Sequence, residues 1–325
     1  MTTKIWPEKK IVAIGGGSGI STILSGIKKY TSKVSAIISV SDNGGSTGRL
    51  RNDLGIIAPG DIRNCLVSLA NTDTYMKKLF DYRFPEGELK GHCFGNIFLA
   101  ALDGVFNDFG KAIYKTGEIL SITGKVYPLT LENTSLIAQL ENGMIVRGES
   151  QIPEFSQEQK SRISRVFLDP YEVELYEDSK KDIERADLIV LGPGSLYTSI
   201  LPNLLAKDMV NLIEKSSAKV VYVVNVVTQK GETGGYSVKD HYDAVIKHSK
   251  KNIVDAIIVN NGKVDKELVD KYEKTGGELL YLNDEERKFF KENNIDIIED
   301  DFIRIIDNQI RHNADKLSEM LINYI

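Results

Sequence analysis

The feature that most constrains the fold of this chain is a short apolar run that stops at a glycine-rich loop. The run covers Ile11–Ile14, and the loop after it consists of Gly15, Gly16, Gly17, Ser18 and Gly19. Apolar residues then recur at helical spacing as far as Tyr30, and the β-branched run Val34–Val40 has the character of a second strand. This order of strand, glycine loop, helix and strand predicts the opening of a doubly wound, mostly parallel, Rossmann-like α/β sheet.

The same α/β pattern returns in the second half of the chain. A helical segment that includes Leu204 and Leu212 separates two of the later strands, and a helix over Asn313–Ile325 closes the chain. The later strands are predicted over Leu188–Leu191, Lys219–Asn225, Ala256–Asn260 and Ile295–Ile298. We therefore expect residues 1–325 to form a single α/β domain.

Two segments interrupt this pattern. Residues 60–122 have helical periodicity, notably over Phe94–Phe106 and Ala112–Leu120, and predict a helical insertion. Residues 123–170 alternate apolar and polar side chains, and predict a small antiparallel β region. Within it, the dipeptide Asn142-Gly143 stands between two apolar runs, which is the strongest short-range signal for a β-hairpin.

Composition excludes several classes of function. The 325 residues carry 41 basic and 46 acidic side chains, a formal net charge of −5, which disfavours a general nucleic-acid binder. The longest apolar run, Ile97–Leu102, has six residues, against the roughly 18 needed for a membrane span. Met1–Lys10 has no apolar stretch typical of a secretory signal, and Cys65 and Cys93 are too few for a disulfide framework or a CxxC zinc site. We therefore expect a cytoplasmic protein.

The Gly15–Gly19 loop is the first candidate binding site. Glycines between a strand and a helix let phosphate oxygens approach the backbone N–H groups at the positive end of the helix. A tight turn without a ligand is the alternative. The loop does not match the dinucleotide fingerprint, because the third glycine would fall on Ile20 or Thr22, and no Gly-Lys-Ser/Thr of a P-loop follows. We expect a phosphate-bearing ligand and no nicotinamide cofactor.

Polar residues follow three more strands at the same edge of the predicted sheet. Asp42 and Asn43 open the glycine-rich stretch Asp42–Gly60, which has no clear period and is expected to be an irregular loop. Asn225 ends another strand, and the glycine-containing loop Thr228–Tyr236 after it has the composition of a lid. The strand at Leu188–Leu191 is followed by Gly192, Pro193, Gly194 and Ser195. Open α/β sheets bind ligands at this edge. The alternatives are a surface loop for Asp42–Gly60, a strand-end cap for Asn225 and a plain strand–helix turn for Gly192–Ser195.

Four further residues are weaker candidates. Asp61 is a catalytic acid or a helix cap, and His92 contacts substrate or packs as a cap. Arg311 and His312 precede the last helix, where a cation and N-terminal backbone donors suit an anion, unless Arg311 is a plain surface side chain. No HxxxH or HExxH spacing indicates a zinc site.

Six motifs in a fixed order carry a family resemblance across nearly the whole chain from Lys10 onward: GGGSG, DNGGSTGRLR, PGDIRNCL, GHCFGN, LGPGSLYTS and IRHN. They resemble the bacterial gluconeogenesis factor family, which is itself similar to 2-phospho-L-lactate transferase. The resemblance implies that Gly15–Gly19 and Gly192–Ser195 hold a nucleotide and its phosphates. It also implies that Asp42 and Asn43 face a transfer centre or a metal, with Asp42 as the Mg²⁺ ligand or catalytic carboxylate.

Three functions are compatible with these observations. The resemblance to the bacterial family favours a regulatory protein that binds a UDP-sugar such as UDP-N-acetylglucosamine, and that acts in cell shape and cell-wall precursor supply during gluconeogenic growth. The transferase relatives imply instead a Mg²⁺-dependent phospho-transferase that releases a nucleoside monophosphate. The third is a nicotinamide-dependent oxidoreductase, which the missing third glycine opposes. A homo-oligomer without a nucleic-acid partner is compatible with the first two.

Overall fold

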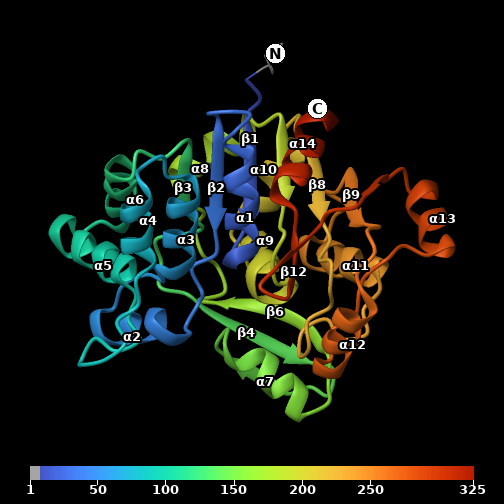
Figure 1. Ribbon diagram of the computed structural model, residues 1–325, viewed down its shortest axis with the longest axis horizontal. Helices are drawn as coiled ribbons and strands as arrows, with labels where there is room; N and C mark the ends of the chain where they lie inside the picture. The colour runs from blue at the N-terminus through green and yellow to red at the C-terminus, as the bar shows by residue number, and fades with distance from the viewer. Residues whose placement is uncertain (1–7) are drawn as a thin grey trace.

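The computed structural model describes residues 8–325, and its centre is a seven-stranded parallel sheet (Figure 1). Residues 1–7, part of the segment in which we expect no secretory signal, lie outside the described range. The strands stand in the order β10-β9-β8-β7-β1-β2-β3, with these bounds: β1 Ile11–Gly15, β2 Val34–Ile38, β3 Lys125–Pro128, β7 Leu188–Leu191, β8 Lys219–Val223, β9 Ala256–Asn260 and β10 Asp296–Asp300. The doubly wound α/β fold predicted from the sequence is confirmed.

Helices cover both faces of this sheet. Ile11 and Ala13 of β1 point into one core, whereas Val12 and Ile14 point into the other. The first core is covered by α1 (Gly17–Ile27), α3 (Gly60–Leu69) and α14 (Ala314–Tyr324), and the second by α8 (Glu177–Glu184), α9 (Leu201–Leu204), α10 (Met209–Lys215) and α11 (Val238–Ser249). Strands that are buried on both faces are almost entirely apolar, with Ser35 of β2 an exception, which is why short apolar runs were sufficient to predict them.

The helical and antiparallel segments both form. Residues 60–122 contain α3, α4 (Thr74–Asp81), α5 (Phe94–Phe106) and α6 (Phe109–Ile119), although α3 packs against α1 as part of the main layer. A three-stranded antiparallel sheet has the order β5-β4-β6, with β4 at Ser135–Leu140, β5 at Ile145–Arg147, β6 at Ile163–Asp169, and α7 (Gln151–Glu158) before β6. The predicted hairpin joins β4 to β5, with Gly143 at a positive φ of 87°.

The structure corrects three expectations about the elements. Lys125–Pro128, expected within the antiparallel region 123–170, instead pairs parallel with β2 in the main sheet. The stretch Asp42–Gly60 is not irregular, because Gly45–Leu54 forms helix α2, whose Leu50 is buried. The helix expected around Leu204 and Leu212 is divided into the π-helix η1 (Leu196–Ile200), α9 and α10.

Elements near the C-terminus include one hairpin that the sequence did not predict. Strands β11 (Ile303–Ile306) and β12 (Gln309–His312) pair antiparallel between β10 and α14. The turn consists of Asp307 and Asn308, both at positive φ, and lacks the glycine of the usual hairpin signal. Helices α12 (Lys266–Thr275) and α13 (Asp284–Glu292) lie between β9 and β10.

The strand order creates a crevice between β1 and β7. From β1 the chain proceeds to β2 and β3, and later elements return to the other side of β1 as β7 to β10. At such a switch point the loops after the two neighbouring strands diverge, and open α/β sheets bind ligands there. The loops in question are Gly15–Gly19 after β1 and Gly192–Ser195 after β7.

A pair of glycines tests the packing of the helical layer. A Cβ on Gly26 of α1 would lie 2.5 Å from the carbonyl oxygen of Ala314 in α14, whereas a Cβ on Gly104 of α5 would meet open space. We expect Gly26→Ala to lower the free energy of unfolding by about 1–3 kcal/mol. The matched Gly104→Ala should raise it by up to about 1 kcal/mol, because alanine is the better helix former. Urea denaturation measures both, and equal effects would contradict the packing.

Candidate functional site: a cleft at the topological switch point

The loops after β1 and β7 touch each other through their backbones. A Cβ on Gly19 would lie 2.8 Å from the carbonyl carbon of Pro193, and one on Gly194 would lie 3.2 Å from the carbonyl oxygen of Gly16. Gly17, at the start of α1, has a φ of +66°, which favours glycine. The absence of side chains at Gly19 and Gly194 therefore allows the two loops to touch. Gly19 also keeps the first turn of α1 free of a side chain.

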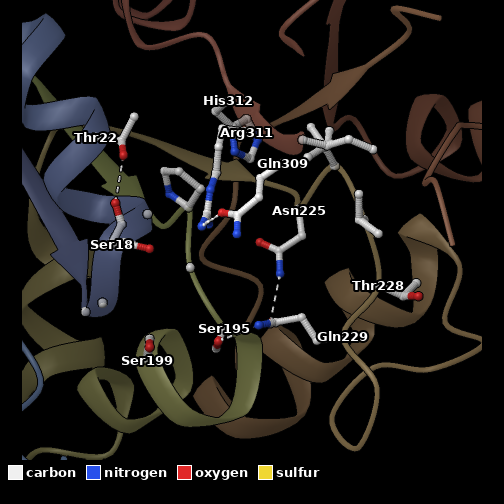
Figure 2. Close-up of a pocket in the computed structure, with 18 of the residues that line it drawn as sticks. Ser18, Thr22, Ser195, Ser199, Asn225, Thr228, Gln229, Gln309, Arg311 and His312 are labelled. Atoms are coloured by element: carbon white, nitrogen blue, oxygen red, sulfur yellow. Dashed lines mark hydrogen bonds between the residues drawn. The ribbon is translucent and has the colours of Figure 1, made fainter. Parts of the chain in front are cut away.

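These loops form one wall of a cleft of about 370 Å³. Figure 2 shows Ser18 and Thr22 of α1 on one side, Ser195 and Ser199 below them, and the β12 hairpin opposite. Most of the binding residues predicted from the sequence line it: Gly16, Gly17, Ser18, Gly19, Pro193, Gly194, Ser195, Asn225 and Arg311. Gly15, Gly192, Asp42, Asn43 and Asp61 are not part of its lining.

Asn225 belongs to a chain of amide and hydroxyl groups across the cleft floor. Its Nδ2 donates to Gln229 Oε1 at 3.5 Å, and Gln229 Nε2 donates to Ser195 Oγ at 2.8 Å. The loop after Asn225 lines the cleft with Thr228 and Gln229. The middle of this loop is anchored rather than free, because Glu232 is buried and accepts hydrogen bonds from Tyr197 N and Thr198 Oγ1 at 3.1 Å each.

Arg311 lies just before the last helix, as expected, but it enters the cleft from a strand, β12, that was not predicted. Its side chain is exposed and donates to Gln309 Oε1, beside the cleft (Figure 2). His312 has a structural role, since its Nε2 donates to Val224 O at 3.2 Å and thereby ties the hairpin to the sheet. Burial lowers the pKa of His312 to about 4, so this histidine is neutral and supplies no positive charge for an anion.

Asp61 is a cap, but of a neighbouring helix. Its Oδ2 accepts a hydrogen bond of 2.6 Å from Gly17 N, at the N-terminus of α1. Burial raises the pKa of this carboxyl to about 6, the Gly17 N–H opposes the rise, and the negative charge of Asp42 adds to it. A carboxylate therefore already occupies the first backbone donor of α1, which leaves the later donors of the loop for a ligand.

Two further carboxyls, which the sequence did not indicate, lie in the region of Asp42 and Asp61. Burial raises the pKa of Glu149 to about 8, with repulsion from Asp42, Glu232 and Asp61 next in size. Burial likewise raises the pKa of Glu232 to about 7, against hydrogen bonds from Thr198 and Tyr197. Neither position carries a sequence signal, because burial of a glutamate in an irregular segment depends on tertiary structure.

This acidic cluster does not by itself form a metal cage. Within residues 8–325, no three His, Cys, Asp or Glu side chains are arranged to hold a metal ion. Asp42, the expected Mg²⁺ ligand, has its Oδ1 bound to Gly44 N at 2.8 Å. Mg²⁺ often takes only one or two protein carboxylates and completes its shell with substrate phosphates and water. Asp42 thus fits such a role only together with a bound ligand.

Comparison with known proteins identifies the family. The family model for 2-phospho-L-lactate transferase CofD matches residues 11–303. The gluconeogenesis factor of Bacillus subtilis is 40% identical over 319 residues, which cover 98% of each chain. The chain belongs to the gluconeogenesis factor family. A crystal structure from Bacillus halodurans matches with a TM-score of 0.92 at 39% identity, over 97% of this chain and 100% of that one.

Other candidates lie outside the cleft of this gluconeogenesis factor family member. His92 is buried, and its Nδ1 lies 3.2 Å from Ser46 Oγ, which also accepts from Cys93 N. It therefore fastens α2 to α5 and is not a ligand of the cleft. Asn43 donates to Gln151 and accepts from Ser150 N, so that it anchors the start of α7. No helix in the described range is long and apolar enough to cross a membrane.

The raised pKa of Asp61 predicts that the effect of its substitution on stability depends on pH. Its folded pKa of about 6 lies above the usual aspartate value of 3.8, so its ionisation costs stability as the pH rises through this window. In metal-free protein, we expect Asp61→Asn to raise the free energy of unfolding by about 1–3 kcal/mol near pH 8, and by almost nothing near pH 4. Urea titrations at both pH values measure this difference. The exposed control Asp53→Asn should change little, and a loss of stability in Asp61→Asn near pH 8 would contradict the assignment.

Proposed function

We propose that this protein binds a nucleoside-diphosphate sugar, such as UDP-N-acetylglucosamine, in the switch-point cleft. One observation carries the proposal: in a protein of net charge −5, no carboxylate is among the described residues that line the cleft, whereas Arg311 and the α1 backbone N–H groups face it. An anionic diphosphate is favoured by the positive end of a helix and by a guanidinium.

The remaining lining suits the other parts of such a ligand. Amide and hydroxyl groups of Asn225, Gln229 and Thr228 provide donors and acceptors, and Val226 and Val227 provide apolar contact. The cleft volume of about 370 Å³ lies within the range of small-molecule sites. The family name supports a regulatory role in gluconeogenic growth, which we propose to act on cell shape and cell-wall precursor supply.

Calorimetric titration with UDP-N-acetylglucosamine tests the phosphate position. We expect Gly17→Val to weaken binding at least about tenfold, because a side chain there strains a φ of +66° and obstructs the start of α1. Gly17→Ala, a smaller change, should lie between Gly17→Val and the wild type. Circular dichroism checks that each variant is folded. Unchanged affinity in a folded Gly17→Val protein would contradict this placement.

Substitution of Arg311 tests whether its positive charge contributes to binding. Arg311→Ala should weaken binding of UDP-N-acetylglucosamine by about tenfold and leave the weak binding of free N-acetylglucosamine unchanged. The matched control is Arg304→Ala, since Arg304 pairs with Arg311 across the hairpin but does not line the cleft. Equal losses for the nucleotide sugar and the free sugar would refute an anion-binding role.

A second function, Mg²⁺-dependent phospho-transfer with release of a nucleoside monophosphate, is favoured by the acidic cluster beside the phosphate loops. Mg²⁺ would neutralise charge at the phosphates, Asp42 would hold it, and Asp61 would keep the α1 terminus in position. We expect Asp42→Asn to abolish nucleoside monophosphate release if the protein is a transferase. If it is a binding protein, no release occurs in either form and UDP-sugar affinity stays within about twofold.

A further inference from the structure

A second groove lies beside the outer edge of β6. It measures about 380 Å³ and shares no lining residue with the nucleotide cleft. Its accessible apolar surface comes from the half-buried Phe167 of β6, Leu205 and Val210 of α10, above the buried Leu168 and Leu204. We call it the β6 groove.

The β6 groove is strongly basic in an otherwise acidic protein. Its lining includes the acids Glu172 and Asp208, and against them the exposed cations Arg165, Lys207, Lys247, Lys250 and Lys251. Lys207 and Lys251 form exposed ion pairs with Glu174 and Glu214. Arg165 and Lys250 form no ion pair with any residue in the range 8–325, so their charge is available to a partner.

The edge of β6 that faces this groove is only partly covered by α11. β6 is the outer strand of the sheet β5-β4-β6. On the side away from β4, the carbonyl oxygen of Ser164 accepts from Lys247 Nζ at 2.7 Å, and Val166 N donates to His248 Nε2 at 3.1 Å. Lys247 and His248 thus occupy Ser164 C=O and Val166 N–H. Because main-chain groups of an antiparallel strand alternate between its two sides, Val166 C=O and the N–H and C=O of Leu168 point the same way and are the groups left for a partner strand.

We propose that the β6 groove docks an extended, acidic segment of a partner protein, which adds to β6 as a further strand. Val166 C=O and the N–H and C=O of Leu168 supply main-chain hydrogen bonds, and the half-buried Leu205 contacts apolar side chains. The cations Arg165 and Lys250 select acidic side chains. A nucleic acid would use the cations but neither the strand edge nor the apolar floor. The proposal is independent of the ligand in the switch-point cleft.

The probe is a fluorescein-labelled peptide, Asp-Leu-Glu-Val-Glu-Leu-Asp, titrated by fluorescence anisotropy in the absence of nucleotide. We expect the double variant Arg165→Glu, Lys250→Glu to weaken its binding at least about tenfold. The control Lys78→Glu, Lys266→Glu makes the same charge change at exposed positions outside the groove and should alter binding less than about twofold. Absence of peptide binding at about 1 mM, or equal losses in both variants, would overturn the proposal.

A second peptide separates strand addition from simple charge attraction. The same sequence with alternate backbone amides N-methylated keeps its charges but loses its donors along one edge. We expect it to bind at least about tenfold more weakly, and equal affinity would refute strand addition. A single-stranded oligouridylate serves as the competing probe. If it binds more tightly than the peptide and loses binding in the groove variant alone, the groove is a nucleic-acid site and the proposal is wrong.

Discussion

The switch-point cleft depends on a backbone contact between two loops from neighbouring strands. The loop after β1 and the loop after β7 approach so closely at Gly19 and Pro193 that no side chain fits between them. This contact is possible only because β1 and β7 are adjacent, and they are adjacent because the chain reverses its direction of winding at β1. The contact brings Ser18 and Ser195 into one cleft, although 177 positions separate them in the sequence.

Charge is divided between two neighbouring regions of this site. The cleft itself presents Arg311 and backbone N–H groups, whereas Asp61, Glu149 and Glu232 gather behind the loops with raised pKa values. Neighbouring buried carboxyls repel one another when ionised, unless a proton or a cation neutralises their charge. The switch-point cleft and the acidic cluster thus complement each other in the proposed function: a bound phosphate would provide the oxygens that a cation at Asp42 would need.

The strands and glycine loops could be predicted because their chemistry is local. Apolar runs such as Ile11–Ile14 are buried on both faces, and glycine is required wherever backbones touch. Helix α2 was missed because Gly45–Leu54 buries a short face, with Leu50 its main apolar anchor. The β11–β12 hairpin was missed because its turn, Asp307-Asn308, has no glycine. Consequently the strand that carries Arg311 into the cleft was not predicted.

The roles of the remaining site candidates depend on tertiary contacts that the sequence does not reveal. Asp61 had the sequence position of a cap, and it is one, but only the packing of α3 against α1 reveals that it caps Gly17. His92 and His312 carried the residue type of a functional site, yet each fastens one element to another. No period or motif distinguishes such a tether from a ligand-binding histidine, because the difference lies in what surrounds the ring.

The most direct test is a crystal structure of the protein with UDP-N-acetylglucosamine. The account predicts that the diphosphate lies between the N-terminus of α1 and the Gly194–Ser195 backbone, within hydrogen-bond distance of the Ser18 or Gly19 N–H and facing Arg311. A diphosphate bound elsewhere, for example in the β6 groove, with the switch-point cleft containing only water, would contradict it.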